Sequence, residues 1–237
     1  MMRHFAPRSC RRLLLGILLA ATLSSCGESS TEVEVRPESP PAEAPEAAAA
    51  VEPPPAEPSD REISTHGIGP AQLGLTLGEL KQLFDDATFT PQSPFLAEFD
   101  AIAVRQGGEI LFHILHLAGE PMADEDVIQG VFTTNPSFET AEGIGAGTPI
   151  AQAEATYGSA TLSHHRANAS LEYVRFATPP ADNISFGTWA RQPGEATPSY
   201  AGVYPPTGGD YRETTQYDPE AQIQSILVVC LTEICAS

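Results

Sequence analysis

The sequence predicts an α+β domain in which an antiparallel sheet carries short helices on one face, arranged as two α-β-β-β repeats. Three observations indicate this class. The glycine pattern Gly67-Ile68-Gly69 precedes one helix start, and Gly143-Ile144-Gly145 precedes another. Runs of β-branched and aromatic residues follow each helix. Short turns connect these runs, and hairpin-linked strands after a single helix favour an antiparallel sheet over a doubly wound parallel one.

The first helix is predicted to begin at Thr76. Thr76 and Glu79 have the spacing of a capping box, in which the hydroxyl accepts from a first-turn amide and the carboxylate reaches back to the cap. The apolar residues that follow share one side of a helix ending near Asp85: Leu77, Leu80, Leu83 and Phe84.

The second helix is predicted to use Thr148 as its N-cap and Pro149 as its first residue, where the missing N–H costs nothing. Gly158 is the expected left-handed terminator. Both helices are short, so neither would persist without a sheet to cover.

The strand candidates are runs of β-branched, aromatic and other apolar residues. Gly107-Gly108 separates the first two, which predicts a two-residue hairpin turn. The candidates are residues 99–106, 109–117 and 127–132 in the first half, and 171–176, 184–188 and 223–229 in the second.

A resemblance accompanies the first helix start. Leu73-Gly74-Leu75-Thr76, followed by a short amphipathic helix and a β-meander, resembles the helix opening of outer-membrane assembly lipoproteins of the BamE/SmpA/OmlA type, although Leu75 replaces their usual methionine. The tandem arrangement is similar to the β-lactamase-inhibitor-protein fold. The resemblance implies an anchored binding or scaffold protein, and it names no partner.

The N-terminus has the pattern of an export signal over residues 1–25. Basic residues precede the apolar run from Leu13 to Leu23, which is too short to span a bilayer. Leu23-Ser24-Ser25-Cys26 resembles the lipobox of bacterial lipoproteins, which implies cleavage before Cys26 and acylation of its thiol with fatty acids such as palmitate. An ordinary signal peptide with a chance cysteine and an uncleaved anchor are the alternatives.

These features predict a lipid-anchored protein of the cell envelope that faces the periplasm. Gly27, and not an aspartate, follows the cysteine, and the resemblance to sorted lipoproteins then implies the outer membrane over the inner membrane. Arg11-Arg12 leaves twin-arginine export open beside the general secretory route.

Residues 26–61 comprise the lipidated cysteine and a tether rich in proline, alanine and glutamate, which cannot bury enough surface to fold. Residues 62–237 form the predicted folded domain, with halves of about 62–138 and 139–237. The net charge of −19 argues against nucleic acid as a partner and assigns membrane contact to the acyl chains. This acidity serves either solubility or the steering of a basic partner.

The sequence gives only weak indications of a metal site. His113 and His116 lie three residues apart in a predicted strand, where odd spacing sends them to opposite faces. His164-His165-Arg166 is expected in a loop without a third ligand, and Asp124-Glu125-Asp126 lacks the spacing of a calcium loop. No metal, cofactor or catalytic motif is therefore predicted, and the chain is not expected to be an enzyme.

Cys230 and Cys235 are predicted to form a disulfide in an oxidising compartment, with a redox-active pair as the alternative. The segment from Trp189 to Gln222 is the predicted partner-binding surface, since rigid aromatics supply contact area at low entropic cost. Its named residues are Trp189, Tyr200, Tyr204 and Tyr211. The alternative is that this segment folds back and covers an open sheet face.

Three functions are consistent with these patterns. The expected one is a monomeric, lipid-anchored envelope protein that binds or scaffolds an unidentified protein. The alternatives are an inhibitor of a periplasmic or foreign hydrolase, and an enzyme or small-ligand carrier, which a polar cleft joining distant side chains would support.

Overall fold

The computed structural model describes residues 60–96, 98–168, 171–188, 200–206 and 208–231. All of them belong to one compact unit, Pro54–Ser237. The predicted signal peptide, Cys26 and the tether up to residue 59 lie outside the described residues. Within the described part of the chain, no helix combines the length and apolarity needed to span a membrane.

The described elements, in chain order, are short strands with two helices and one 3₁₀ turn. They are β1 (Ile63–Ser64), β2 (Gly67–Ile68), β3 (Ala71–Gln72), α1 (Leu77–Leu83), β4 (Thr88–Leu96), β5 (Phe99–Gln106), β6 (Glu109–Leu117), β7 (Gly130–Thr133), α2 (Ile150–Tyr157), β8 (Ala160–His165), η1 (Arg166–Asn168), β9 (Glu172–Phe176), β10 (Ile184–Gly187), β11 (Tyr211–Thr214) and β12 (Ser225–Val229).

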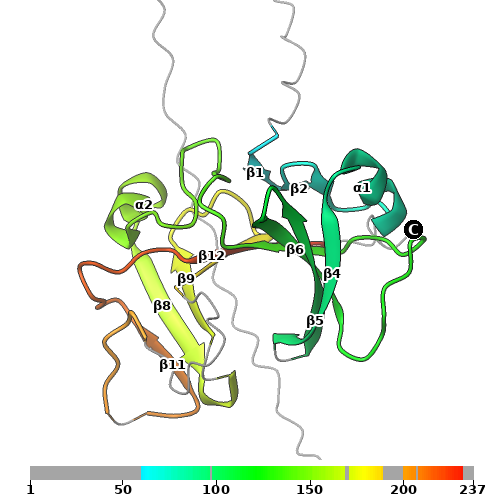
Figure 1. Ribbon diagram of the computed structural model, residues 1–237. Helices are drawn as coiled ribbons and strands as arrows, with labels where there is room; N and C mark the ends of the chain where they lie inside the picture. Colours follow the sequence, from blue (N-terminus) through cyan, green and yellow to red (C-terminus); the bar gives the residue numbers. More distant parts are fainter. Residues whose placement is uncertain (1–59, 97, 169–170, 189–199, 207, 232–237) are drawn as a thin grey trace, which may run out of the picture. The chain divides into compact units, whose positions relative to one another are not determined.

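A nine-stranded sheet organises the domain, in the order β11-β8-β9-β10-β12-β7-β6-β5-β4. All of its neighbouring strands are antiparallel. The strands β4 to β6 and the strands β8 to β10 lie on opposite sides of the centre of the sheet (Figure 1), and the pairing of β12 with β7 joins them. Strands β1, β2 and β3 form a separate three-stranded sheet.

The structure is mainly antiparallel β, so the α+β prediction holds only in its coarse form. Four strands follow α1 and five follow α2, which corrects the expected three after each helix. The expectation missed β4 because Pro91 and Pro94 interrupt it, and prolines are tolerated here because β4 is an edge strand. It missed β8 because His164-His165-Arg166 was assigned to a loop; the two histidines end the strand instead.

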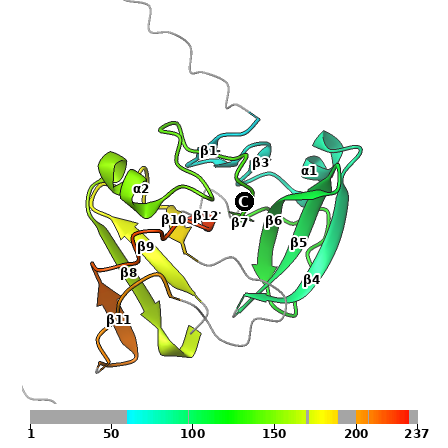
Figure 2. The ribbon, with the colours of Figure 1, turned by 60° about the vertical axis from the view of Figure 1, so that its left-hand side comes forward.

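Both helices pack on the same face of the large sheet and share one core (Figure 2). Leu77 and Leu80 of α1 and Ile150 and Ala153 of α2 are fully or almost fully buried there. A smaller apolar cluster contains residues that alternate with the core positions along β5, β6, β7 and β12, and so lies on the opposite face: Ala101, Leu115, Phe132 and Leu227, with Phe95, Leu96 and Leu171.

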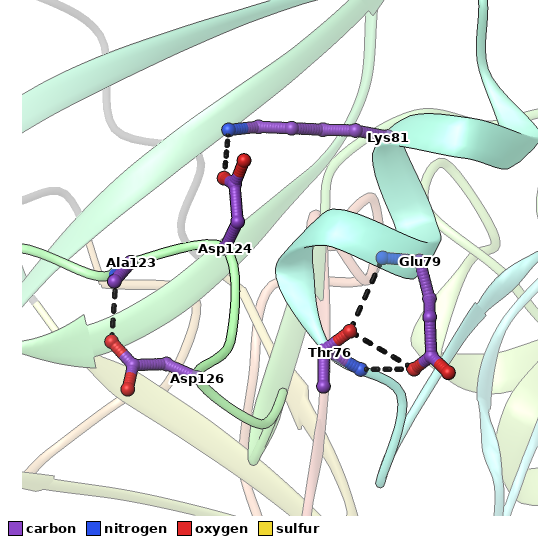
Figure 3. Close-up of polar contacts among 6 residues, drawn as sticks. All are labelled: Thr76, Glu79, Lys81, Ala123, Asp124 and Asp126. Atoms are coloured by element: carbon purple, nitrogen blue, oxygen red, sulfur yellow. Dashed lines mark hydrogen bonds and ion pairs between the residues drawn. The ribbon is translucent and has the colours of Figure 1, made fainter.

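The capping box at the start of α1 is confirmed (Figure 3). The Glu79 amide donates to Thr76 Oγ1 at 3.2 Å, and the Thr76 amide donates to Glu79 Oε2 at 2.8 Å. The second bond lowers the pKa of Glu79, since it favours the charged carboxylate. Lys81 pairs with Asp124, and Asp126 accepts from the Ala123 amide, so the acidic run forms a turn held against this helix.

The start of α2 differs from the prediction. Its N-cap is Pro149, and no side chain caps the helix. The Thr148 hydroxyl accepts from the Gly145 amide at 3.0 Å, and its carbonyl accepts from the Ile223 amide at 2.8 Å. The hydroxyl that would cap the helix is therefore bonded to the turn before it, and the carbonyl is paired with the chain before β12.

Two glycine predictions are confirmed. Gly107 and Gly108 have φ values of 60° and 90° and form the two-residue turn between β5 and β6. Gly158 ends α2 with a φ of 79°.

Candidate functional site

Three polar residues form a row across three neighbouring strands at one end of the sheet. In the antiparallel register, His164 of β8 lies directly opposite Glu172 of β9 on one side and opposite Arg212 of β11 on the other. Directly opposite residues in a sheet point to the same face. The strands β9, β8 and β11 lie side by side (Figures 1 and 2), so the row brings together residues that are far apart in the chain.

This row continues the core face of β8. Ala160, Leu162 and His164 alternate with more exposed residues along the strand, and all three are buried. The core-facing positions are therefore apolar near α2 and become polar at His164. On β9, the core-facing positions become polar at Glu172, which has only 1% of its surface exposed.

Four hydrogen bonds reach the buried Glu172 carboxylate. Oε2 accepts from Thr188 Oγ1 and from the Ala201 amide at 2.8 Å. Oε1 accepts from the Gly202 amide at 3.0 Å and from the Tyr204 hydroxyl at 2.7 Å. A charge can be buried when such donors replace water, so Glu172 fixes the segment 200–206 against the end of the sheet.

Two tyrosines of that segment pack against His164. The ring of Tyr200 stacks on the imidazole with centroids 4.1 Å apart and an interplanar angle of 18°. The ring of Tyr204 meets it edge-on at 4.5 Å. Tyr204 is also tied to Glu172, so these aromatic walls have fixed positions.

The electrostatics follow from burial and from the nearby charges. Burial lowers the pKa of His164; Glu172 opposes this change, while Arg212 and Arg166 add to it. Burial also raises the pKa of Tyr200 and Tyr204, and the hydrogen bond to Glu172 contributes for Tyr204. At neutral pH, the site therefore contains a neutral imidazole and neutral phenols beside two guanidinium groups.

A pocket of about 360 Å³ opens here, lined by His164, Arg166, Tyr200, Tyr204 and Arg212. Arg212 Nη1 donates to the Pro205 carbonyl at 2.9 Å. His164 Nδ1 and Arg212 Nε are buried and have no hydrogen-bond partner in the described part of the chain. Buried nitrogens of this kind are uncommon, and a ligand is one way to satisfy them.

Chemically, this arrangement can bind an anion, because two guanidinium groups face one cavity. The Glu172 carboxylate already accepts four hydrogen bonds, which leaves it poorly placed to act as a general base.

The predicted partner-binding residues separate in the structure. Tyr200 and Tyr204 line the pocket, whereas Tyr211 alternates with Arg212 along β11 and faces the other side of the sheet. The Tyr211 hydroxyl donates to Glu213, which pairs with Arg175. Trp189 lies outside the described residues.

Part of the predicted aromatic segment covers the core, as the alternative reading expected. Tyr204 and Tyr217 pack against the main core, and the Tyr217 hydroxyl donates to Glu154 of α2 at 2.6 Å. The segment also contains β11, which the prediction left as loop. Cys230 is disulfide-bonded, and its predicted partner Cys235 lies outside the described residues.

The other histidine pair does not form a site. His113 is 6% exposed and stacks on Phe95, with ring centroids 4.5 Å apart, whereas the less buried His116 contacts the carbonyls of Leu117 and Glu120. No group of three or more histidine, cysteine, aspartate or glutamate residues in the described ranges is arranged to hold a metal ion.

The sequence prediction missed Glu172 and Arg212 and treated His164 only as a weak metal ligand. The alternation of Ala160, Leu162 and His164 is the signal that could have placed His164 on a strand facing the core. The register across β9, β8 and β11 has no comparable local signal.

No protein-family model, curated protein or solved structure matches this chain.

Proposed function

We propose that the chain is a monomeric, lipid-anchored binding protein of the bacterial cell envelope that acts by contact with a partner protein. The lipobox-like sequence that ends at Cys26 supports its place at the membrane, with residues 27–61 as an acidic tether. The glycine after Cys26 favours the outer membrane. No catalytic role is assigned.

The resemblance to BamE-type lipoproteins and to the β-lactamase-inhibitor-protein fold is part of this proposal. In support, α1 precedes the run β4-β5-β6-β7, and α2 precedes β8, β9, β10 and β12, with β11 added at the edge. The last strands of the two runs, β7 and β12, pair at the centre of the sheet. We propose that these are two α-β-β-β-β repeats.

The observation that carries the binding role is the pocket formed by His164, Tyr200 and Tyr204 with Arg166 and Arg212. Tyrosine and arginine are the residues that dominate protein interfaces, and here Glu172 fixes the segment that carries the tyrosines. A prepositioned aromatic surface loses little side-chain entropy on binding.

Site-specific photo-crosslinking in cells tests the proposal. A photoreactive amino acid at position 203, which is exposed beside Tyr204, should capture a defined envelope protein that mass spectrometry can identify. Tyr200→Ala should abolish this capture, while Tyr173→Ala, on the outer face of β9, should leave it unchanged. Equal capture by the Tyr200→Ala variant would contradict a docking role for the pocket.

The anchor has its own test. Mass spectrometry of the protein purified from membranes should find Cys26 at the N-terminus with acyl chains attached, and Cys26→Ser should release the protein from the membrane fraction. An unmodified Cys26 within a longer chain would exclude the proposed anchor.

A small-ligand carrier is the second candidate, because the cavity joins polar and aromatic side chains from distant segments of the chain. Native mass spectrometry of the full chain distinguishes the two functions. A carrier should retain a small molecule of defined mass, whereas a protein-docking pocket should be recovered empty.

A further inference from the structure

The pocket is a local positive site in a strongly acidic chain. The sequence has 12 basic and 31 acidic residues, yet Arg166 and Arg212 line one cavity. Arg166 forms no ion pair in the described part of the chain, whereas Arg175 and Lys81 each pair with a carboxylate. Guanidinium groups left to face a cavity favour an anionic ligand.

The charges around the cavity favour a ligand with a single negative charge. Arg166 and Arg212 contribute two positive charges, the buried Glu172 contributes one negative charge, and His164 is neutral because burial lowers its pKa. The sum is one positive charge. A carboxylate neutralises it, whereas a phosphate dianion would leave an excess negative charge in a chain that already repels anions.

Two nitrogens of the residues that line the pocket have no acceptor among the described residues. Arg212 Nε is buried without an acceptor among the described residues, although its Nη1 is bound to the Pro205 carbonyl. His164 Nδ1 is also buried and unpartnered there, and in the appropriate tautomer it donates. The terminal nitrogens of a guanidinium group bind a carboxylate in a fixed, planar geometry.

The remaining volume favours an apolar body attached to the carboxylate. The cavity of about 360 Å³ far exceeds one carboxylate group, which occupies on the order of the volume of two water molecules, about 60 Å³. The stacked rings of Tyr200 and His164 provide a flat wall, and flat apolar groups pack well against such a surface.

We infer that this pocket binds one carboxylate carried by an aromatic or similarly apolar group, with Arg166 and Arg212 contacting the carboxylate and Tyr200 contacting the apolar group. The C-terminal residue of a polypeptide and a free aromatic acid both have this chemistry. The inference rests on the proposed function in using the same pocket, and it defines what a partner must present there.

Calorimetric titration of the full chain, purified in detergent, tests this inference without a partner protein. Four probes separate the contributions: N-acetylphenylalanine represents a peptide C-terminus, benzoate a free acid, N-acetylphenylalanine amide the same body without the charge, and inorganic phosphate a different anion. At least one acid should bind, and the amide and phosphate should bind about tenfold more weakly or worse.

Variants locate the binding. Arg166→Gln and Arg212→Gln should each weaken the acid by about tenfold, since each removes a charged hydrogen bond. Arg175→Gln is the matched control, because Arg175 is exposed on the other face and pairs with Glu213; it should change the affinity by no more than about twofold. Arg212 also holds Pro205, so Arg166→Gln carries the test if the Arg212 variant does not fold.

Tighter binding of benzoate than of N-acetylphenylalanine supports a free acid as the ligand, and the reverse order supports a peptide terminus. Failure of both acids, equal binding of the amide, tighter binding of phosphate or an equal loss in Arg175→Gln would overturn the inference. If the acids fail while Tyr200→Ala still abolishes partner capture, the proposed function stands without this inference.

Discussion

Replacing Glu172 with glutamine tests whether the buried carboxylate holds the pocket together. Each carboxylate oxygen accepts two hydrogen bonds, one from a hydroxyl and one from a backbone amide. Glutamine keeps the size of the side chain but replaces one oxygen with an NH₂ group. The Thr188 and Tyr204 hydroxyls can rotate to accept from it, whereas the Ala201 or Gly202 amide cannot.

The expected loss of unfolding free energy follows from the number of hydrogen bonds that the substitution changes. One orphaned backbone amide costs about 1 to 3 kcal/mol, and the three remaining bonds change from charge-assisted to neutral, each losing roughly 1 kcal/mol. Removing a buried charge returns part of this energy. We therefore expect the Glu172→Gln variant to lose about 2 to 4 kcal/mol of unfolding free energy, a large share of the stability of an ordinary domain.

Urea denaturation followed by near-ultraviolet circular dichroism measures this loss, and hydrogen exchange at the Ala201 and Gly202 amides reports whether the segment 200–206 opens locally. Glu213→Gln is the control, because the hydrogen bond and ion pair of Glu213 are exposed to solvent, and this variant should lose much less unfolding free energy than Glu172→Gln. The reasoning is refuted if both variants lose the same small amount and the two amides keep their protection.

Three further changes have defined outcomes. Thr76→Ala removes the capping hydroxyl and should cost about 1 kcal/mol in urea denaturation, while Thr76→Ser should restore most of it; equal losses would exclude the cap as the cause. Burial, with a smaller contribution from Arg105, lowers the pKa of His113 from 6.5 to about 4. The unfolded chain therefore binds this proton first, so stability should be full above pH 6.5 and fall as the pH decreases toward about 4. The His113→Phe variant should show a smaller loss between pH 7 and pH 5, and an unchanged slope would contradict this assignment. Gly158→Ala places a Cβ 3.0 Å from the Ala177 Cβ at a φ of 79°, and should cost about 1 to 3 kcal/mol. Gly147 has a similar positive φ, but no atom lies near the position of an added Cβ. Gly147→Ala should therefore lose less stability than Gly158→Ala when both variants are compared by thermal denaturation. A larger loss for Gly147→Ala would contradict the steric argument.

Local chemistry made part of the fold predictable. The Thr76–Glu79 capping box and the Gly107-Gly108 hairpin were predicted correctly, because each depends on residues within one turn of the chain. The Thr148 cap was wrong because the Thr148 hydroxyl accepts from the Gly145 amide, while the Thr148 carbonyl pairs with the Ile223 amide of a distant segment. Tertiary pairing overrode a local preference there.

The candidate site was only partly predictable. The aromatic composition of residues 189–222 directed attention to Tyr200 and Tyr204, which line the pocket. The row of Glu172, His164 and Arg212 depends on the register of three strands, and Arg212 enters it from an edge strand far along the chain. No spacing in the sequence encodes that register, so the polar centre of the pocket could be found only in the structure.

Because β12 lies at the centre of the large sheet, the sheet cannot be completed until the end of the chain has been synthesised. The strands β4 to β7 are synthesised well before β12, and β7 can pair with β12 only after residues 225–229 have been added. Until then, Val131 and the backbone groups around it form an open apolar edge, the kind of surface that recruits other chains. Removing β12 should therefore cause aggregation of the remaining chain instead of leaving a smaller soluble domain.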